Sequence, residues 1–414
     1  MNGLFEFLKT SYTAYQAVQN AQTYLTQRGF CRLFEGEPWN IAEGGKYFVI
    51  RGGSSLIAFT VNKGTSFKIV ASHTDSPCLK LKENPVIAAE GVYKLNAEPY
   101  GGGIYYSFFD RPLKIAGRTV TEKNGALTAA SYVSDFQVTI PSLAVHMNRE
   151  TNEKFAPNPQ IDLLPLLAAS EINFAELLGD PLSYDLFLAC AEEPFTSGAN
   201  GEFLTAPRVD NLTSVYASLT ALGKEGAGVC VAACLDHEEV GSQTAQGAGG
   251  DFLSVTLTRI ASARGLSQEE YFRALSSSFL VSLDNAHALH PNRPEKCDPT
   301  NRAKMGGGIV IKSHANKAYT TEAMSSALVK TIFEKANVSY QTFYNRSDMR
   351  SGSTLGAIIQ GQVSMLSVDL GIAQLAMHAM METFCKQDYA ALIEGLTAIY
   401  RSEICIQGET LTVK

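Results

Sequence analysis

The chain has 414 residues, 45% of them apolar and 18% charged, which is typical of a globular protein with room for two or three domains. Its 34 basic and 41 acidic residues give a formal net charge of −7, so it lacks the basic surface that nucleic-acid-binding proteins need. Apolar runs such as 229–235 fall far short of the roughly 20 residues of a membrane-spanning helix. We therefore expect neither nucleic acid nor a membrane as a partner.

The start of the chain and the cysteines predict a cytoplasmic location. The first residues include the acidic Glu6 and lack the basic segment, apolar run and cleavage site of a secretory signal. The eight cysteines are scattered and show neither the close pairs of a zinc knuckle nor those of a disulfide scaffold. We expect reduced and mostly buried thiols.

The N-terminal part predicts a helix followed by a hairpin. Apolar residues recur at helical spacing from 14 to 25, with Thr13 as the N-cap and Gly29 as the stop. Two β-rich runs, 47–50 and 56–60, flank a turn rich in glycine and predict paired strands.

The sequence pattern changes after the next predicted strand. The strand covers 67–72 and ends at His73, and a triple glycine at 101–103 and a strand-like run at 132–140 follow. This pattern favours a second, β-rich domain inserted into the first. The domains that we predict are a catalytic domain of residues 1–80 and 191–414 and an inserted domain of residues 81–190.

Helical and strand patterns alternate after the insertion. Such alternation predicts an α/β fold with a mainly parallel sheet flanked by helices. The predicted elements are a helix at 212–222, a strand at 229–235, a helix at 267–276, a strand at 279–283, a helix at 325–336, a strand at 365–368 and a helical tract at 373–401.

Several predicted strands end in side chains that bind metals well. One strand is followed by residues 73–75 (His-Thr-Asp), another by 236–239 (Asp-His-Glu-Glu) and a third by Asp284. Because ligands of open α/β sheets bind beyond the carboxyl ends of the strands, we expect these side chains to converge. Together with Asp210 and His378 they form the ligand set of a two-metal hydrolase.

Each of these residues also has an ordinary structural interpretation. Asp210 would cap a helix, Glu238 and Glu239 would form a solvated turn, Asp284 would stabilise a turn, and His378 would be a core histidine on a helical face. A charged side chain without a partner beside a buried strand costs folding free energy, however. The joint pattern therefore favours a metal site.

The spacing of the residues excludes other catalytic motifs. Gly241 stands where an HExxH motif needs its second histidine, and Ser353 is misplaced for a nucleophile elbow. No phosphate-binding or dinucleotide-binding glycine motif follows a suitable strand. A glycosidase with paired carboxylates stays open as an alternative, but it leaves the histidines unexplained.

Longer strings extend this pattern over almost the whole chain. In chain order they include SHTDSPCLKLK (72–82), YGGGIYYSFFDRPLKIAGR (100–118), APRVDNLTS (206–214), DHEEVGSQTAQGAG (236–249) and VDLGIAQLAMHAM (368–380). These strings resemble the M18 family of aspartyl aminopeptidases. The resemblance implies a zinc-peptidase-like fold in which the inserted β-rich domain serves dimerisation.

The resemblance also implies two divalent metal ions, zinc or in its place manganese or cobalt. Asp210 would bridge the two ions with one oxygen on each, and Asp75 would hold the far ring nitrogen of His73. Glu238 would be the general base, pointing away from Glu239 at an extended strand end. The ligands that the resemblance implies are His73, Asp210, Glu239, Asp284 and His378.

Four further residues are candidates for substrate binding by the same resemblance. The family prefers an acidic N-terminal residue, which requires a cation, and Lys312 beside Tyr319 is our candidate, unless it is an ordinary exposed strand lysine. His287 would donate to the oxyanion or the substrate side chain, or be a solvated loop residue. His146 resembles the residue that reaches a neighbouring subunit's site, with burial in a dimer contact as the alternative.

These observations predict a cytoplasmic aminopeptidase that removes N-terminal Asp or Glu from peptides and forms a homo-oligomer, a dodecamer in the family. A broader aminopeptidase, an N-acyl amidohydrolase and a non-catalytic oligomeric scaffold are the alternatives. The chain departs from the family in two places: Tyr105-Tyr106, where many relatives have a tryptophan, and residues 191–198. Both departures concern the substrate-facing surface and the subunit contacts.

Overall fold

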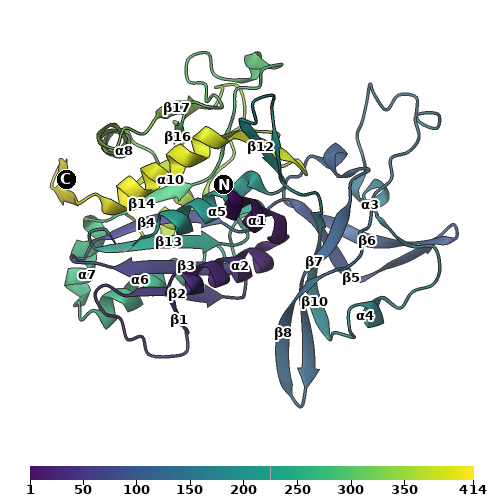
Figure 1. Cartoon of the computed structure of the whole chain (residues 1–414), viewed down its shortest axis with the longest axis horizontal. Helices are drawn as coiled ribbons and strands as arrows, with labels where there is room; N and C mark the ends of the chain where they lie inside the picture. Colours follow the sequence, from purple (N-terminus) through teal and green to yellow (C-terminus); the bar gives the residue numbers. More distant parts are fainter. Residues whose placement is uncertain (224) are drawn as a thin grey trace.

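The computed structural model describes residues 1–223 and 225–414. Two β-sheet units lie side by side (Figure 1), a larger one covered by long helices and a smaller one with short helices only. Within the described residues, no helix combines the length and the apolar character that crossing a bilayer requires.

The larger sheet has nine strands in the part of the chain that the structure describes, and most neighbouring pairs are parallel. The central strands are buried along their whole length, which explains their continuous apolar runs. The predicted mainly parallel α/β sheet is therefore confirmed. In spatial order the strands are β1 (Cys31–Leu33), β2 (Lys46–Arg51), β3 (Ser55–Val61), β13 (Val229–Leu235), β4 (Phe67–His73), β14 (Phe279–Leu283), β18 (Leu366–Gly371), β16 (Ile309–Ser313) and β17 (Tyr340–Tyr344).

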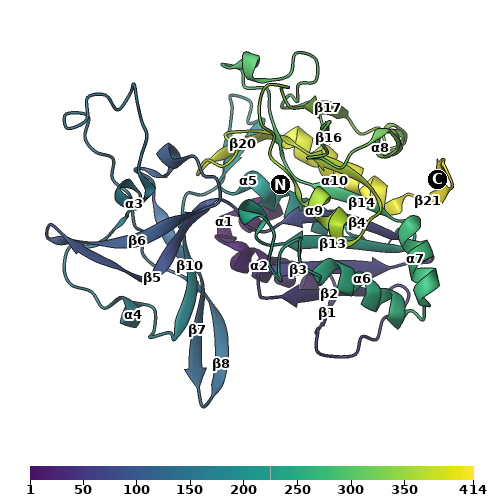
Figure 2. The same ribbon diagram turned by 180° about the vertical axis from the view of Figure 1, so that it is seen from behind.

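Helices cover both faces of this sheet, and each face has its own apolar cluster. The face seen in Figure 1 carries α1 (Asn2–Thr10), α2 (Ala14–Gln27), α5 (Val209–Ala221), α8 (Ala323–Lys335) and α10 (Lys386–Arg401). The opposite face, seen in Figure 2, carries α6 (Phe252–Ala263), α7 (Gln268–Ser276) and α9 (Leu355–Gln362).

The smaller unit is a six-stranded antiparallel sheet with a separate apolar cluster. Its strands fall between Cys78 and Cys190, so the β-rich insertion is part of the fold. Two short helices, α3 (Pro159–Asp162) and α4 (Phe174–Leu177), accompany it. In spatial order the strands are β8 (Ala126–Val133), β7 (Leu113–Lys123), β10 (Ser183–Cys190), β5 (Cys78–Ala89), β6 (Val92–Tyr100) and β9 (Leu166–Ala168).

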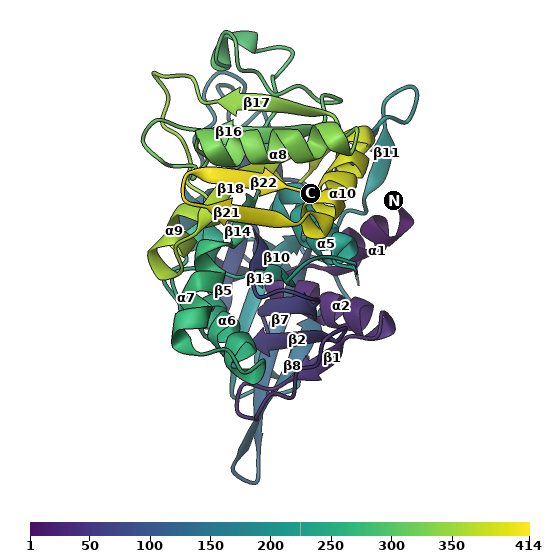
Figure 3. The same cartoon turned by 90° about the vertical axis from the view of Figure 1, so that its left-hand side faces the viewer.

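The predicted helical tract at 373–401 is wrong in its first half. That half contains β19 (Ala373–Leu375) and β20 (Glu382–Cys385), which belong to a small sheet with β11 (Phe195–Ser197), β12 (Phe203–Ala206) and β15 (Ala286–His287). The Ala, Leu and Met residues there favour a helix, but pairing with distant strands overrides the local preference. The chain ends in a hairpin of β21 (Ile404–Gln407) and β22 (Thr410–Val413), which lies beside α8 (Figure 3).

Candidate metal centre

Three parallel strands bring most of the candidate residues together. β4 lies between β13 and β14 and is parallel to both, so the carboxyl ends of the three strands meet at one edge of the sheet. His73 ends β4, Asp284 directly follows β14, and the turn 236–240 follows β13. Asp210 comes from the first turn of α5 and His378 from the loop between β19 and β20.

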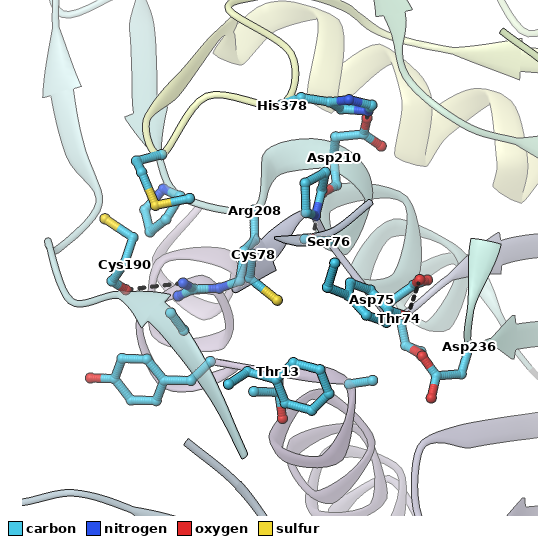
Figure 4. A pocket seen from close by; sticks show the side chains of 18 of the residues that line it. Thr13, Thr74, Asp75, Ser76, Cys78, Cys190, Arg208, Asp210, Asp236 and His378 are labelled. Carbon is cyan, nitrogen blue, oxygen red and sulfur yellow. Dashed lines mark hydrogen bonds and ion pairs between the residues drawn. The ribbon is translucent and has the colours of Figure 1, made fainter. Parts of the chain in front are cut away.

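Asp210 lies between the two histidines. Its Oδ1 is 3.3 Å from His73 Nε2, and its Oδ2 is 3.5 Å from His378 Nε2. Figure 4 shows the Asp210 carboxylate pointing at the ring of His378. Each oxygen of one carboxylate therefore faces a different imidazole, which is the arrangement that a bridge between two cations needs.

The remaining donors complete two groups around this carboxylate. Asp284 Oδ1 is 3.6 Å from His73 Nε2, and Glu239 Oε1 is 3.5 Å from His378 Nε2. Within each group the donor atoms lie within 4.8 Å of one another. The two groups are His73, Asp210 and Asp284, and Asp210, Glu239 and His378.

The chemistry of these donors fits divalent cations. Asp210 and His73 are 4% and 1% exposed, and the buried Oδ1 atoms of Asp210 and Asp284 have no hydrogen-bond partner. A buried carboxylate oxygen without a partner is costly. Imidazole nitrogens with carboxylate oxygens are the donor set that zinc and its neighbours accept.

The charges in the cluster shift the ionisation of its members strongly. Burial raises the pKa of Asp210, but the neighbouring His378 and His73 rings outweigh it and hold that pKa well below its usual range. Burial lowers the pKa of His378, but Asp210 and Glu239 raise it to about 10. Burial raises the pKa of Glu238 to about 7, close to the neutral pH at which a proton carrier works best.

Asp75 holds the opposite side of His73. Its Oδ1 lies 3.3 Å from His73 Nδ1, and its backbone oxygen lies 3.1 Å from the same nitrogen. The backbone N–H groups of Glu238 and Glu239 donate to its two carboxylate oxygens, each over 3.1 Å. Asp75 therefore connects the end of β4 to the turn after β13.

Three local conformations differ from the sequence-based expectations. Glu238 and Glu239 lie in a 3₁₀ turn, Glu238–Val240, and not at an extended strand end, because His237 adopts a left-handed conformation with φ 62°. The N-cap of α5 is Arg208 and not Asp210, which lies two residues further on with the non-helical angles φ −83° and ψ 108° and faces the histidines. His378 lies in a loop with φ 69°, not on a helical face.

Glu382 is a functional candidate that the sequence analysis missed. Its side chain is buried, Oε2 accepts the Asp210 N–H over 3.0 Å, and Oε1 accepts the His378 N–H over 2.8 Å. One carboxylate therefore ties the backbones of two candidate ligands together. An acidic residue four positions after His378, inside an apolar segment, was the only signal in the sequence.

The candidate substrate residues lie in different surroundings. Lys312, at 1% exposure, is not an exposed strand lysine: its Nζ lies 3.7 Å from Asp284 Oδ2 and 5.1 Å from the centre of the buried Tyr319 ring. His287 is exposed on β15, which follows Asp284. His146 is exposed in a loop of the six-stranded unit and is not part of the cluster among the described residues.

The helix-covered, mainly parallel sheet with imidazoles and carboxylates beyond its strand ends places the protein in the zinc-peptidase-like class. The family model described as "Aminopeptidase I zinc metalloprotease (M18)" matches residues 7–179 and 178–400. The chain therefore belongs to the M18 family of zinc aminopeptidases.

Individual relatives agree with this assignment. The "Probable M18 family aminopeptidase 2" of Clostridium acetobutylicum is 40% identical over 421 residues, covering 96% of this chain and 97% of that protein. A chain in the cryo-EM structure of the Ape4 and Nbr1 complex is 32% identical with a TM-score of 0.91, covering 96% of this chain and 84% of that chain. The S. cerevisiae mApe1 dodecamer is 25% identical with a TM-score of 0.83, covering 97% and 96%.

Proposed function

We propose that this protein is a two-metal aminopeptidase that removes an N-terminal Asp or Glu from peptides. The observation that carries the two-metal proposal is the position of Asp210, whose oxygens face His73 at 3.3 Å and His378 at 3.5 Å. His73 and Asp284 would complete one ion's site, and Glu239 and His378 the other's. The bound ions, zinc by the family's description, would polarise the scissile carbonyl and make water more acidic.

Glu238 is the carboxylate that neither three-residue group around Asp210 includes. It lies within 4.8 Å of donor atoms of His73 and Glu239, so it faces the same space. We assign it the proton transfer: its carboxylate takes a proton from the attacking water and returns it to the departing amine.

The acidic specificity rests on the buried ammonium group of Lys312. Its charge lies beside Asp284, so a substrate carboxylate bound near Lys312 would be held next to the reacting carbonyl. The exposed His287 would supply a second donor to the side chain or to the oxyanion. The ion pair with Asp284 favours one other candidate function, a broader aminopeptidase, because Asp284 already neutralises part of the Lys312 charge.

A substrate panel tests the specificity. Asp-, Glu-, Leu- and acetyl-amino-acid substrates would be assayed side by side, with and without a chelator. We expect chelator-sensitive turnover that is fastest with Asp or Glu. Faster turnover of Leu substrates would establish the broader aminopeptidase, fastest turnover of acetyl-amino acids the amidohydrolase, and an absence of chelator-sensitive hydrolysis the scaffold.

We further propose assembly into a homo-oligomer, a dodecamer like that of the mApe1 relative. The segment around His146 carries several large apolar side chains that are 44–74% exposed, which supports a subunit contact there. His146 would reach a neighbouring subunit's site from this segment. The exposed apolar residues are Leu143, Val145, Met147, Phe155 and Ile161.

A mixing experiment tests the role of His146. Subunits with Glu238→Gln and subunits with His146→Ala would each be nearly inactive alone. Co-assembled particles should regain activity, because an intact His146 from one subunit would serve an intact Glu238 of its neighbour. Unchanged activity of His146→Ala alone would remove this residue from the mechanism.

A further inference from the structure

The inserted sheet reaches the metal centre through one short segment. The segment 100–107 connects the end of β6 to the 3₁₀ turn Tyr105–Phe108. Tyr100 lines the same pocket as His378, Asp75 and Arg208, and Figure 4 labels these last three residues. This segment belongs to the insertion by sequence, yet several of its polar contacts are with residues of the candidate metal centre.

At one end of the segment, Tyr100 contacts the residue that holds His73. The Tyr100 hydroxyl lies 2.8 Å from Asp75 Oδ2. An ionised carboxylate only accepts hydrogen bonds, so the hydroxyl donates. With the N–H groups of Glu238 and Glu239, this contact fixes the orientation of the Asp75 carboxylate beside His73 Nδ1.

The middle of the segment contacts the second histidine directly. The carbonyl oxygen of Gly102 lies 3.0 Å from His378 Nδ1. A carbonyl oxygen cannot donate, so Nδ1 must carry the proton in this contact, and in the neutral ring Nε2 keeps the lone pair that faces Asp210. The Ile104 N–H donates to the His378 carbonyl oxygen over 3.0 Å, and the Met380 N–H donates to Ser107 Oγ over 3.0 Å.

The glycines of this segment allow it to lie this close. Gly101 has φ +73°, and a Cβ atom there would lie 3.0 Å from Glu239 Cβ. Any other residue would therefore meet both backbone strain and a crowded contact with a candidate ligand.

We infer that the segment 100–107, which belongs to the inserted sheet, is a positioning element of the metal centre. It determines which ring nitrogen carries the proton in His73 and in His378. The inference rests on the proposed function, in which His73 and His378 are metal ligands. Partners of the second ring nitrogen are worth about 10-fold to 100-fold in metal affinity. The inserted sheet therefore contributes to metal binding in addition to any role in assembly.

The substitution Tyr100→Phe tests this inference on the full-length chain. It removes the hydroxyl and keeps the ring, whose edge-to-face contact with Phe187 has a centroid distance of 5.5 Å. Zinc affinity would be measured by competition with a chromogenic chelator, and site geometry by the absorption spectrum of the cobalt(II)-loaded chain. We expect weaker binding of zinc, by no more than the ~10-fold to 100-fold that loss of a direct partner of the ring nitrogen costs, and a changed cobalt spectrum.

A matched control is available in the same sheet. The single proton of the Tyr184 hydroxyl is shared between the backbone oxygens of Lys82 and Glu83, which lie 2.8 and 2.7 Å from the hydroxyl oxygen, and neither residue belongs to the cluster. Tyr184→Phe should leave zinc affinity and the cobalt spectrum unchanged.

The outcomes separate this inference from the proposed function. A wild-type chain that binds no zinc contradicts the proposed function. A wild-type chain that binds zinc while Tyr100→Phe folds, binds it equally well and keeps the cobalt spectrum overturns the positioning role alone. If Tyr100→Phe does not fold, Gly101→Ala decides: weaker zinc binding supports the inference, and unchanged binding overturns it.

Discussion

The two sheet units differ in how the charges of their carboxylates are satisfied. In the six-stranded unit, Asp185 is paired with Lys80 and Arg118, each at 3.0 Å. At the edge of the nine-stranded sheet, Asp210 and Asp284 keep buried oxygens without a hydrogen-bond partner. A carboxylate with cationic partners needs no further ligand, whereas buried carboxylate oxygens without a hydrogen-bond partner are costly and fit the binding of divalent cations. The comparison shows that the carboxylates with unsatisfied buried oxygens lie at the edge of the nine-stranded sheet, among the candidate ligands.

The largest effect on turnover is expected at Glu238, the carboxylate that is not a ligand in either proposed ion site. Glu238→Gln should retain both metal ions and lose about 10²-fold to 10⁴-fold in turnover, the usual contribution of general acid–base catalysis. Metal content and kcat would be measured on the same sample.

Glu239→Gln is the matched control, because it removes a candidate ligand from the neighbouring position. It should weaken metal loading first. Near-normal turnover of Glu238→Gln would remove Glu238 from the mechanism.

Glu382 should contribute to the stability of the folded site. In Glu382→Gln, one of the two oxygens that accept the Asp210 and His378 N–H groups is replaced by a donor. An unsatisfied buried N–H costs about 1–3 kcal/mol. We expect a loss of that size in the unfolding free energy of the metal-free chain, measured by urea denaturation below about pH 4.5, where the carboxyl group is protonated in both states; a chain as stable as wild type would contradict the assignment.

The pH dependence of stability should differ between the two units. The pKa of His378 is raised to about 10, so its stabilising contribution is complete below the unfolded value of about 6.5 and is lost as the pH rises through 10. Burial and the charge of Asp210 raise the pKa of Glu382 to about 8, so folding is penalised progressively as the pH rises from about 4.5 to 8. The metal-free cluster should therefore lose stability towards alkaline pH.

The paired charge of the other unit should respond in the opposite direction. Burial raises the pKa of Asp185, but Lys80 and Arg118 outweigh this and hold it below its usual range. Its contribution is complete above about pH 4 and is lost as the pH falls through the lowered value. Thermal melts of the metal-free chain, with and without Asp185→Asn, would check this: the variant should lessen the acid loss only.

The smallest effect on folding is expected at the exposed apolar surface. Met147, which is 74% exposed, should tolerate Met147→Ser with a change within about 0.5 kcal/mol in the unfolding free energy. Light scattering should nevertheless detect weaker assembly. Particles of unchanged size would show that this side chain lies outside the subunit contact.

The sequence predicted those features of the molecule that local patterns encode. The strands Val229–Leu235 and Phe279–Leu283 agree with the predicted runs because buried parallel strands are apolar along their whole length. The convergence of His73 and Asp284 followed from the rule that ligands bind beyond strand ends.

Features that depend on long-range contacts were missed. The loop of His378 is held by Glu382 and by Gly102 of the insertion, and the turn of Glu238 is held by Asp75. The burial of Lys312 depends equally on packing, and its sequence surroundings left exposure open. Spacing along the chain carries no information on such partners.

The order in which the cluster's residues occur along the chain has a consequence for biosynthesis. His73 lies near the beginning of the chain and His378 near its end, yet both face the same carboxylate of Asp210. A growing polypeptide folds from its N-terminus onwards, so the centre stays incomplete until the last β-strands have emerged. A copy truncated before His378 would therefore lack one of the two imidazoles that face Asp210.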